Sequence, residues 1–160
     1  MQMATTGLDT FDRTLQETNH WLRIVMAELK TDSRHQAYIA LRAGLHALRD
    51  RIGPECAVHF GAQLPILLRG VFYEGWEPSE TPIRERRLDD FLAYVESMLG
   101  PNAGIDPAEA LSATFAAIAE SVPFPEVLKL VNVLPRDLKA LWPGHLFGKV
   151  SSIGSLARSA

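Results

Sequence analysis

Four basic side chains share one face of a predicted helix between residues 33 and 52. They are His35, Arg42, His46 and Arg49. Spacings of seven, four and three residues keep all four on that face. Guanidinium groups and titratable imidazoles suit oxyanions, so we predict that this face binds an anionic small molecule or an acidic protein surface. Two alternatives are a solvated face with local ion pairs and a face that docks the acidic second half of the chain.

Two Glu/His pairs have the spacing of metal ligands. Glu17 precedes His20 by three residues, and Glu55 precedes His59 by four. Two ligands do not close a metal site, and the chain lacks the second Glu-x-x-His motif that di-iron bundles require. We therefore predict no metal and no cofactor. The alternative class is a metal- or anion-binding protein, or an enzyme, that uses these residues together with His46.

The only cysteine, Cys56, lies three residues before His59. Cysteine most often behaves as a small buried hydrophobe, and this spacing alone does not activate a thiolate. Glycine-rich phosphate loops and Cys-x-x-Cys pairs are absent from the sequence. We predict no catalytic residue. A lone cysteine forms no internal disulfide, which favours a cytoplasmic location.

An aromatic cluster occupies residues 72–76, where the first half of the chain meets the second. In the structural interpretation, these aromatic side chains seal the junction, and Gly75 allows the turn. In the functional interpretation, Tyr73 and Trp76 anchor a ligand or a partner, because their rings tolerate partial exposure. Both residues therefore join the candidate binding site.

Apolar residues recur at helical spacing through most of the chain and predict a series of helices. The first covers about residues 10–30, and Asp32 or Ser33 caps a second that ends at Gly53-Pro54. The expected buried stripe of the first helix is Phe11, Leu15, Leu22, Val25 and Leu29. We expect its partner to be the face of the second helix that carries Tyr38, Leu41, Leu45, Leu48 and Ile52.

Prolines punctuate the rest of the chain. A third helix begins at Pro54, and Pro65 is expected to break or restart it because proline lacks an amide proton and clashes with the preceding turn. We expect a kink there, followed by a short helix that carries Leu67, Leu68 and Val71. Thr81-Pro82 and Asp106-Pro107 have the form of an N-cap followed by a first-turn proline, and each is expected to open a helix. A last helix is expected to kink at Pro135.

The sequence resembles itself at an offset of 70 residues. Residues 21–72 then align without a gap over 91–142, with ten identities that include Leu64-Pro65 over Leu134-Pro135. The shared register of the Leu-Pro pairs and the three-helix order indicates two tandem units, residues 8–77 and 78–143. We predict an all-α fold in which both units pack as one bundle over residues 8–143. Residues 144–160 form a tail that either docks as a short helix or stays loose.

The second helices of the two units differ in charge. Residues 33–52 hold four arginines and one aspartate, a formal charge of +3, whereas residues 106–121 hold three acids and no base, a formal charge of −3. We expect the later helix to be buried on all sides and the earlier one to turn its basic face outward. A ligand site therefore belongs to the first half.

The overall charge excludes some function classes. Sixteen Lys and Arg against nineteen Asp and Glu give a net charge of −3, which argues against general nucleic-acid binding. We expect neither a signal peptide nor a membrane span, because the first nine residues lack a basic and an apolar region and no apolar run is long enough to span a membrane. A homodimer is one further expected assembly, since helical bundles with spare apolar surface self-associate.

Several runs of the chain resemble the bacterial family called domain of unknown function 2267. The runs are residues 37–51, Gln63-Leu64-Pro65, Leu68-Arg69-Gly70 and Tyr73-Glu74-Gly75-Trp76, with Leu134-Pro135, Leu138 and Leu141-Trp142-Pro143 near the end. The resemblance covers roughly residues 8–143. It implies a small all-helical bacterial protein and brings no catalytic residues with it. Our prediction is therefore a non-enzymatic binding or interaction module.

Overall fold

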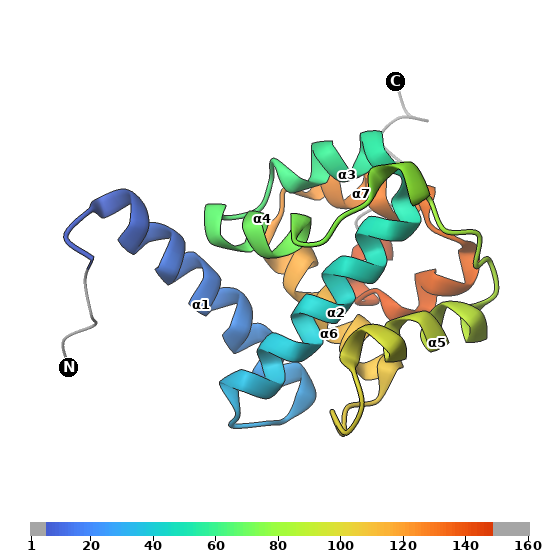
Figure 1. Ribbon diagram of the computed structural model, residues 1–160, viewed down its shortest axis with the longest axis horizontal. Helices are drawn as coiled ribbons and strands as arrows, with labels where there is room; N and C mark the ends of the chain where they lie inside the picture. Colours follow the sequence, from blue (N-terminus) through green and yellow to red (C-terminus); the bar gives the residue numbers. More distant parts are fainter. Residues whose placement is uncertain (1–5, 149–160) are drawn as a thin grey trace.

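The computed structural model describes residues 6–148, and within this range the regular structure is entirely helical (Figure 1). This confirms the predicted all-α class. The elements are α1 (Asp9–Leu29), α2 (Arg34–Ile52), α3 (Pro54–Gly61), α4 (Ile66–Tyr73), the 3-10 turn η1 (Pro78–Glu80), α5 (Leu88–Leu99), α6 (Pro107–Ser121), α7 (Phe124–Val133) and the 3-10 turn η2 (Arg136–Leu141).

The two central helices begin at the predicted caps. The Ser33 side chain accepts a hydrogen bond from the Gln36 amide at 3.1 Å, and the Asp106 carboxylate accepts one from the Glu109 amide at 3.0 Å. Each cap satisfies an amide that the first helical turn leaves without a partner. Gly53 ends α2 with φ +85°, a conformation that favours glycine.

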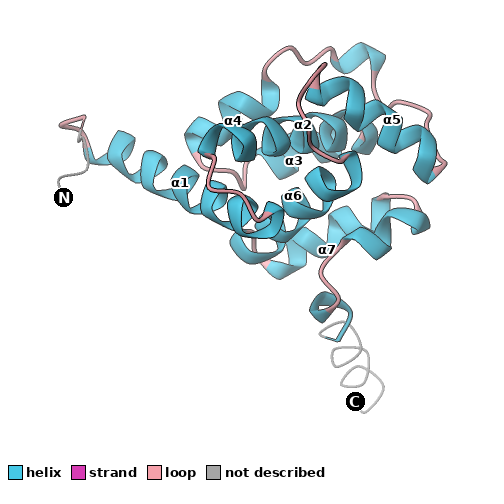
Figure 2. Cartoon of the chain, turned by 90° about the horizontal axis from the view of Figure 1, so that it is seen from below, coloured by secondary structure: helices cyan, strands magenta, loops and turns pink. Residues whose placement is uncertain are grey.

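The buried stripe of α1 matches the prediction in part, since Val25 is buried and Leu22 and Leu29 pack half-buried against the core. Thr14, Thr18, Trp21 and Val25 are the buried residues, whereas Phe11 is 54% exposed. Phe11 is exposed because the first turns of α1 project beyond the rest of the molecule (Figures 1 and 2). Phe11 continues the buried face of α1 into a region where no other helix covers it.

The Leu-Pro pairs end helices instead of bending them. α3 stops at Gly61 and α4 starts at Ile66, with Pro65 between them in an extended conformation, ψ 147°. Pro135 has nearly the same conformation, ψ 146°, between α7 and η2. An extended proline cannot belong to a continuous helix, so the expected kinks are full breaks.

Thr81-Pro82 does not open a helix, contrary to the sequence prediction. The Thr81-Pro82 bond is cis, and the next helix, α5, begins only at Leu88 after the segment 83–86, which has no regular secondary structure. The Ile83 amide donates to the Asp50 carbonyl at 2.8 Å, which holds this segment against the end of α2. The connection between the halves thus lies beside the candidate site.

The core forms around α2 and α6, which cross at the centre of the molecule. Gly44 of α2 lies against Thr114 of α6, and both are buried. α1 packs on α6 as well as α2, and α5 packs on α2 as well as α6. Each half therefore contributes its first helix to the other half, so the two halves share one hydrophobic core.

Helix α6 is buried along most of its length, as predicted. At the end of the described chain, Leu146 is 3% exposed, so the first residues of the predicted tail pack on the core. Residues 149–160 lie outside the described part, and the prediction for the tail stands there as a prediction. Among residues 6–148, no helix has the length and apolarity required to cross a membrane.

Candidate ligand-binding site

The basic stripe of α2 does not form an outward face. His46 and Arg49 are each 3% exposed, Arg42 is half-buried, and His35 alone is fully exposed at the start of the helix. The prediction of a solvated basic face is therefore wrong for the second half of α2. The reason is its central position, because α1, α3, α4, α5 and α6 all pack against it.

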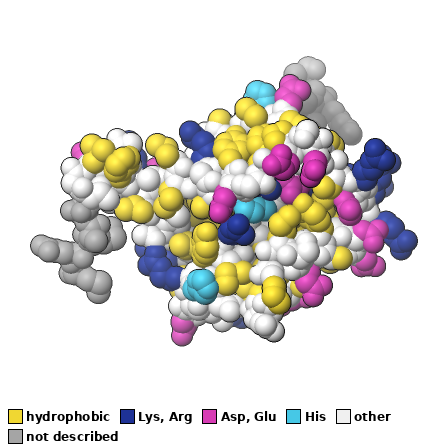
Figure 3. Space-filling model, in the orientation of Figure 1, with side chains coloured by type: hydrophobic (Ala, Val, Ile, Leu, Met, Phe, Trp, Pro, Cys, Tyr) yellow, Lys and Arg dark blue, Asp and Glu magenta, His cyan; other side chains and the backbone are white. Residues whose placement is uncertain are grey.

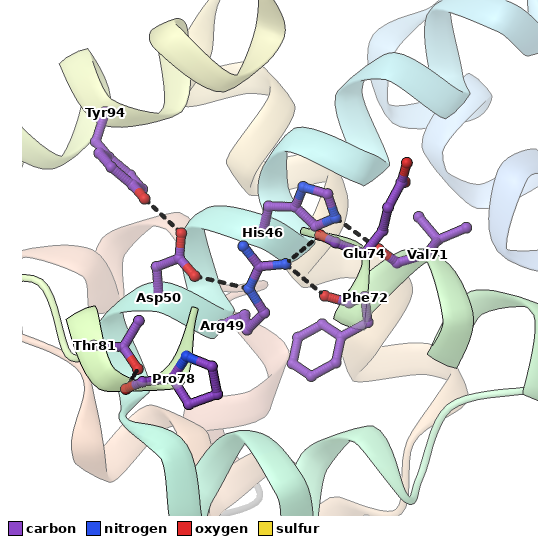
Figure 4. A network of polar contacts seen from close by, with 9 residues as sticks. All are labelled: His46, Arg49, Asp50, Val71, Phe72, Glu74, Pro78, Thr81 and Tyr94. Carbon is purple, nitrogen blue, oxygen red and sulfur yellow. Dashed lines mark hydrogen bonds and ion pairs between the residues drawn. The ribbon is translucent and has the colours of Figure 1, made fainter. Parts of the chain in front are cut away.

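Arg49 binds the end of α4. Its Nη1 donates to the carbonyls of Phe72 and Glu74, both at 2.9 Å (Figure 4). Carbonyls at a helix C-terminus lack partners within the helix and attract positive charge. The Arg49 Nε donates to Asp50 Oδ1 at 2.7 Å, and this buried ion pair compensates the charge of the guanidinium.

His46 lies one helical turn before Arg49 on α2 and contacts the same end of α4. Its Nε2 lies 2.6 Å from the Val71 carbonyl oxygen. Burial lowers the pKa of His46, with Arg49 and Arg42 acting in the same direction, while the Val71 carbonyl and Asp50 oppose the shift. The imidazole is therefore neutral at pH 7. Since a carbonyl only accepts, Nε2 carries the proton and Nδ1 is left as an acceptor.

Asp50 connects this network to the second half of the chain. Its Oδ2 accepts a hydrogen bond of 2.5 Å from the hydroxyl of Tyr94 on α5 (Figure 4). Burial and this carboxylate raise the pKa of Tyr94, because both disfavour a phenolate. Both oxygens of Asp50 are thus engaged, one by Arg49 and one by Tyr94.

A pocket of about 360 Å³ opens beside this network. Arg42, His46, Arg49, Asp50 and Tyr94 contribute to it, and so do three glutamates, Glu74, Glu77 and Glu80. Arg42 pairs with Glu74 at 3.4 Å. Within residues 6–148, neither Glu77 nor Glu80 forms an ion pair. Figure 3 shows acidic side chains gathered on this face beside a histidine.

The aromatic candidates lie elsewhere. The rings of Tyr73 and Trp76 stack with centroids 5.4 Å apart, and both are half-buried against the core. The Tyr73 ring crosses α3 at Gly61, where a Cβ atom would overlap with the Tyr73 hydroxyl. Neither ring lines the pocket, and neither does His35. The structure thus brings together Arg42, His46 and Arg49 but separates them from the other three candidates.

The potential metal ligands do not converge. Glu17 and His20 line a different hollow, together with Glu120. Glu55 and His59 are exposed on α3. In the described part of the chain, no three His, Cys, Asp or Glu residues are arranged to hold a metal ion.

Cys56 does not have the environment of a nucleophile. Burial raises the pKa of its thiol, and the carboxylates of Glu126 and Glu55 raise it further. A raised pKa leaves the thiol protonated at neutral pH, and a thiol is a far weaker nucleophile than a thiolate. The closeness of Cys56 and His59 in the sequence therefore does not correspond to an activated Cys/His pair.

Among the ionisable residues of the pocket, sequence reasoning missed five: Asp50, Glu74, Glu77, Glu80 and Tyr94. A signal existed for Tyr94, because the residue 70 positions earlier is Ile24. A hydroxyl in place of an aliphatic side chain, on a helix that packs against α2, indicates a buried polar partner. Glu77 and Glu80 gave no such signal, since they lie in a connection without helical periodicity.

The fold and the pocket together define an all-helical protein with two interleaved halves and a polar pocket between them. The family described as "Uncharacterized conserved protein (DUF2267)" matches residues 18–141. The chain belongs to this family, as the resemblance in its sequence indicated. Among curated proteins, none matches the chain.

Proposed function

We propose that the protein is a non-enzymatic binding module whose pocket receives a positively charged group, such as a lysine or arginine side chain of a partner protein. One observation carries this proposal. Arg42 and Arg49 are already paired with carboxylates, whereas Glu77 and Glu80 line the same pocket without a pairing cation among the described residues. The unpaired charge of the pocket is negative, and a cation complements it.

The sign of this charge differs from the sequence expectation of an anionic partner. The Asp50 carboxylate compensates the charge of Arg49, which also donates to two carbonyls, and the burial of His46 keeps its imidazole neutral. Only Arg42 is left to attract an anion, and it lies 3.4 Å from Glu74. An anionic small molecule bound through Arg42 is therefore the alternative that the experiment must separate from a cation.

The experiment is calorimetric titration with two short peptides, hexa-arginine and hexaglutamate, at low salt. We expect hexa-arginine to bind, and the variant Glu77→Gln/Glu80→Gln to weaken it by about tenfold, the effect of losing charge-assisted hydrogen bonds. The matched control is Glu28→Gln/Glu96→Gln, which removes the same charge from exposed sites elsewhere. Equal weakening by the control, or binding of hexaglutamate alone, contradicts the proposal.

We also infer that the halves descend from one repeated unit. In the first half the buried residues of the stretch 61–72 are Gly61, Leu64, Leu68 and Phe72. Their counterparts 70 residues later, Val131, Leu134, Leu138 and Trp142, are buried too. This agreement supports the tandem interpretation because burial depends on the packing of whole helices and not on local sequence.

A homodimer is the second candidate, and the projecting end of α1 favours it. Leu8 and Phe11 are 51% and 54% exposed there, and Ile66 and Leu67 at the start of α4 are exposed as well. Light scattering across a concentration series tests this candidate. A dimer that Phe11→Ser converts to a monomer supports it, and a wild-type monomer at every concentration contradicts it. The proposed setting for either assembly is the cytoplasm, which the lone Cys56 favours.

A further inference from the structure

Three arginines line another hollow next to the acidic pocket. This hollow has a volume of about 750 Å³, and its arginines are Arg51, Arg84 and Arg86. Ser79 and Thr81 add hydroxyl groups to its wall, and Glu80 is the one carboxylate among the described residues that line it. Glu80, Thr81 and Ile83 line both hollows, so the cationic hollow adjoins the acidic pocket.

Backbone hydrogen bonds hold Arg51 and the segment that begins at Ile83 beside the end of α2. The Arg51 Nε donates to the Glu85 carbonyl at 3.2 Å, and the Ile83 amide donates to the Asp50 carbonyl at 2.8 Å. Exposure alternates along the segment 83–86, with Arg84 and Arg86 exposed and the residues between and before them half-buried. Arg84 and Arg86 also line the same hollow, so both side chains are open to solvent there.

The charges of these three guanidinium groups are not compensated internally. Across residues 6–148, none of the three forms an ion pair with a carboxylate. This contrasts with Arg42 and Arg49, which are both paired. Unpaired arginines that converge on one hollow fit phosphate oxygens, because a guanidinium donates two parallel hydrogen bonds to such a group.

We propose that the hollow between Arg51, Arg84 and Arg86 is an anion site for a compact ligand with two or more linked phosphate groups. Several linked phosphates match three guanidinium groups better than one phosphate does. An extended polyanion such as a nucleic acid fits less well, since Glu80 lines the hollow and Glu77 lies beyond it. Repulsion from these carboxylates, and the net charge of −3, restrict the site to a small ligand.

The test is calorimetric titration of the full chain with tripolyphosphate, with inorganic phosphate as a weaker comparison. We expect tripolyphosphate to bind and Arg84→Gln/Arg86→Gln to weaken it by about tenfold or more, because two charged donors are lost. The matched control, Arg13→Gln/Arg136→Gln, removes the same charge from exposed positions outside the hollow and should change the affinity by less than about twofold. Equal weakening by both variants overturns the proposal.

Further arms identify the source of the phosphate and keep the two proposed sites apart. Vesicles with phosphoinositide headgroups and a single-stranded oligonucleotide replace tripolyphosphate in parallel titrations. Vesicle binding supports the proposal only where tripolyphosphate competes for it, and binding of the oligonucleotide without tripolyphosphate overturns it. Glu80→Gln should strengthen tripolyphosphate binding while it weakens hexa-arginine binding. The experiments can therefore refute the proposal for either site without refuting the other. All of these side chains are exposed, so unchanged melting curves should show that every variant folds.

Discussion

Gly44 of α2 and Thr114 of α6 touch at the crossing of the two central helices, and they are 70 residues apart in the sequence. This separation equals the offset at which the two halves align. Residues related by a two-fold axis meet each other only where the axis passes between them. The contact is the one expected if a pseudo-two-fold axis relates the two units of the proposed repeat.

The first prediction concerns this crossing. A Cβ atom on Gly44 would overlap with the Thr114 side chain, so Gly44→Thr should destabilise the fold by about 2 kcal/mol or more through overpacking. The exchange Gly44→Thr/Thr114→Gly returns one small and one larger residue to the contact. Urea denaturation should show that the exchange recovers much of the loss. A double variant as unstable as the sum of its singles would argue against the symmetric contact.

The second prediction concerns the buried pair of Arg49 and Asp50. Arg49→Met should lower the free energy of unfolding by about 3 kcal/mol, because it leaves the Asp50 carboxylate without its buried counter-charge. Asp50→Asn removes that charge, so Arg49→Met/Asp50→Asn should cost less than the two single changes added together. Chemical denaturation of the four proteins measures the coupling. Strict additivity would mean that the pair contributes little.

The third prediction is a pH dependence that arises from His46. Its pKa in the folded protein lies below the ordinary value of 6.5, so the unfolded chain takes up a proton first as the pH falls. Stability from this group is therefore complete above the ordinary pKa and declines below it, toward the lower pKa of the folded state. Denaturation midpoints between about pH 7 and pH 5 should fall less steeply for His46→Gln than for the wild type. Identical slopes would refute the role of His46.

The fourth prediction concerns Tyr94. Burial and the Asp50 carboxylate raise its pKa, whereas an unperturbed tyrosine ionises near pH 10. Spectrophotometric titration of the folded protein should show a tyrosine ionisation well above pH 10, and Tyr94→Phe should abolish that step. The same variant should lose about 1.5 kcal/mol of stability, because Tyr94 donates to a charged acceptor. A high-pH titration curve that Tyr94→Phe leaves unchanged would contradict the hydrogen bond between Tyr94 and Asp50.

Local chemistry explains which parts of the fold could be predicted from the sequence. Ser33 and Asp106 cap helices through their own side chains, and Gly53 ends one through its backbone conformation, so each acts within a few residues. The burial of Arg49 could not be predicted in this way. It depends on carbonyls at Phe72 and Glu74, which lie at the end of another helix and become partners only after the tertiary fold has formed.

In the candidate site, too, local features could be predicted and tertiary contacts could not. Helical spacing correctly placed Arg42, His46 and Arg49 on one side of α2, but it carried no information on what that side faces. The predicted burial of Phe11 is wrong for a related reason, since an apolar stripe predicts burial only where a neighbouring helix reaches it. Glu77 and Arg84 lie in a connection between helices, where helical periodicity does not predict the positions of side chains.

The most direct test of the central claim, that the pocket receives a cation, is a ¹H–¹⁵N NMR titration with N-acetyl-arginine amide. This ligand presents a single guanidinium group without the charge density of a peptide. We predict that its largest shifts fall on the amides of Glu77, Glu80 and Ile83, which line the pocket, and that Glu77→Gln/Glu80→Gln removes them. Shifts that appear instead with N-acetyl-glutamate amide and centre on Arg42 would contradict the account and restore the anionic partner.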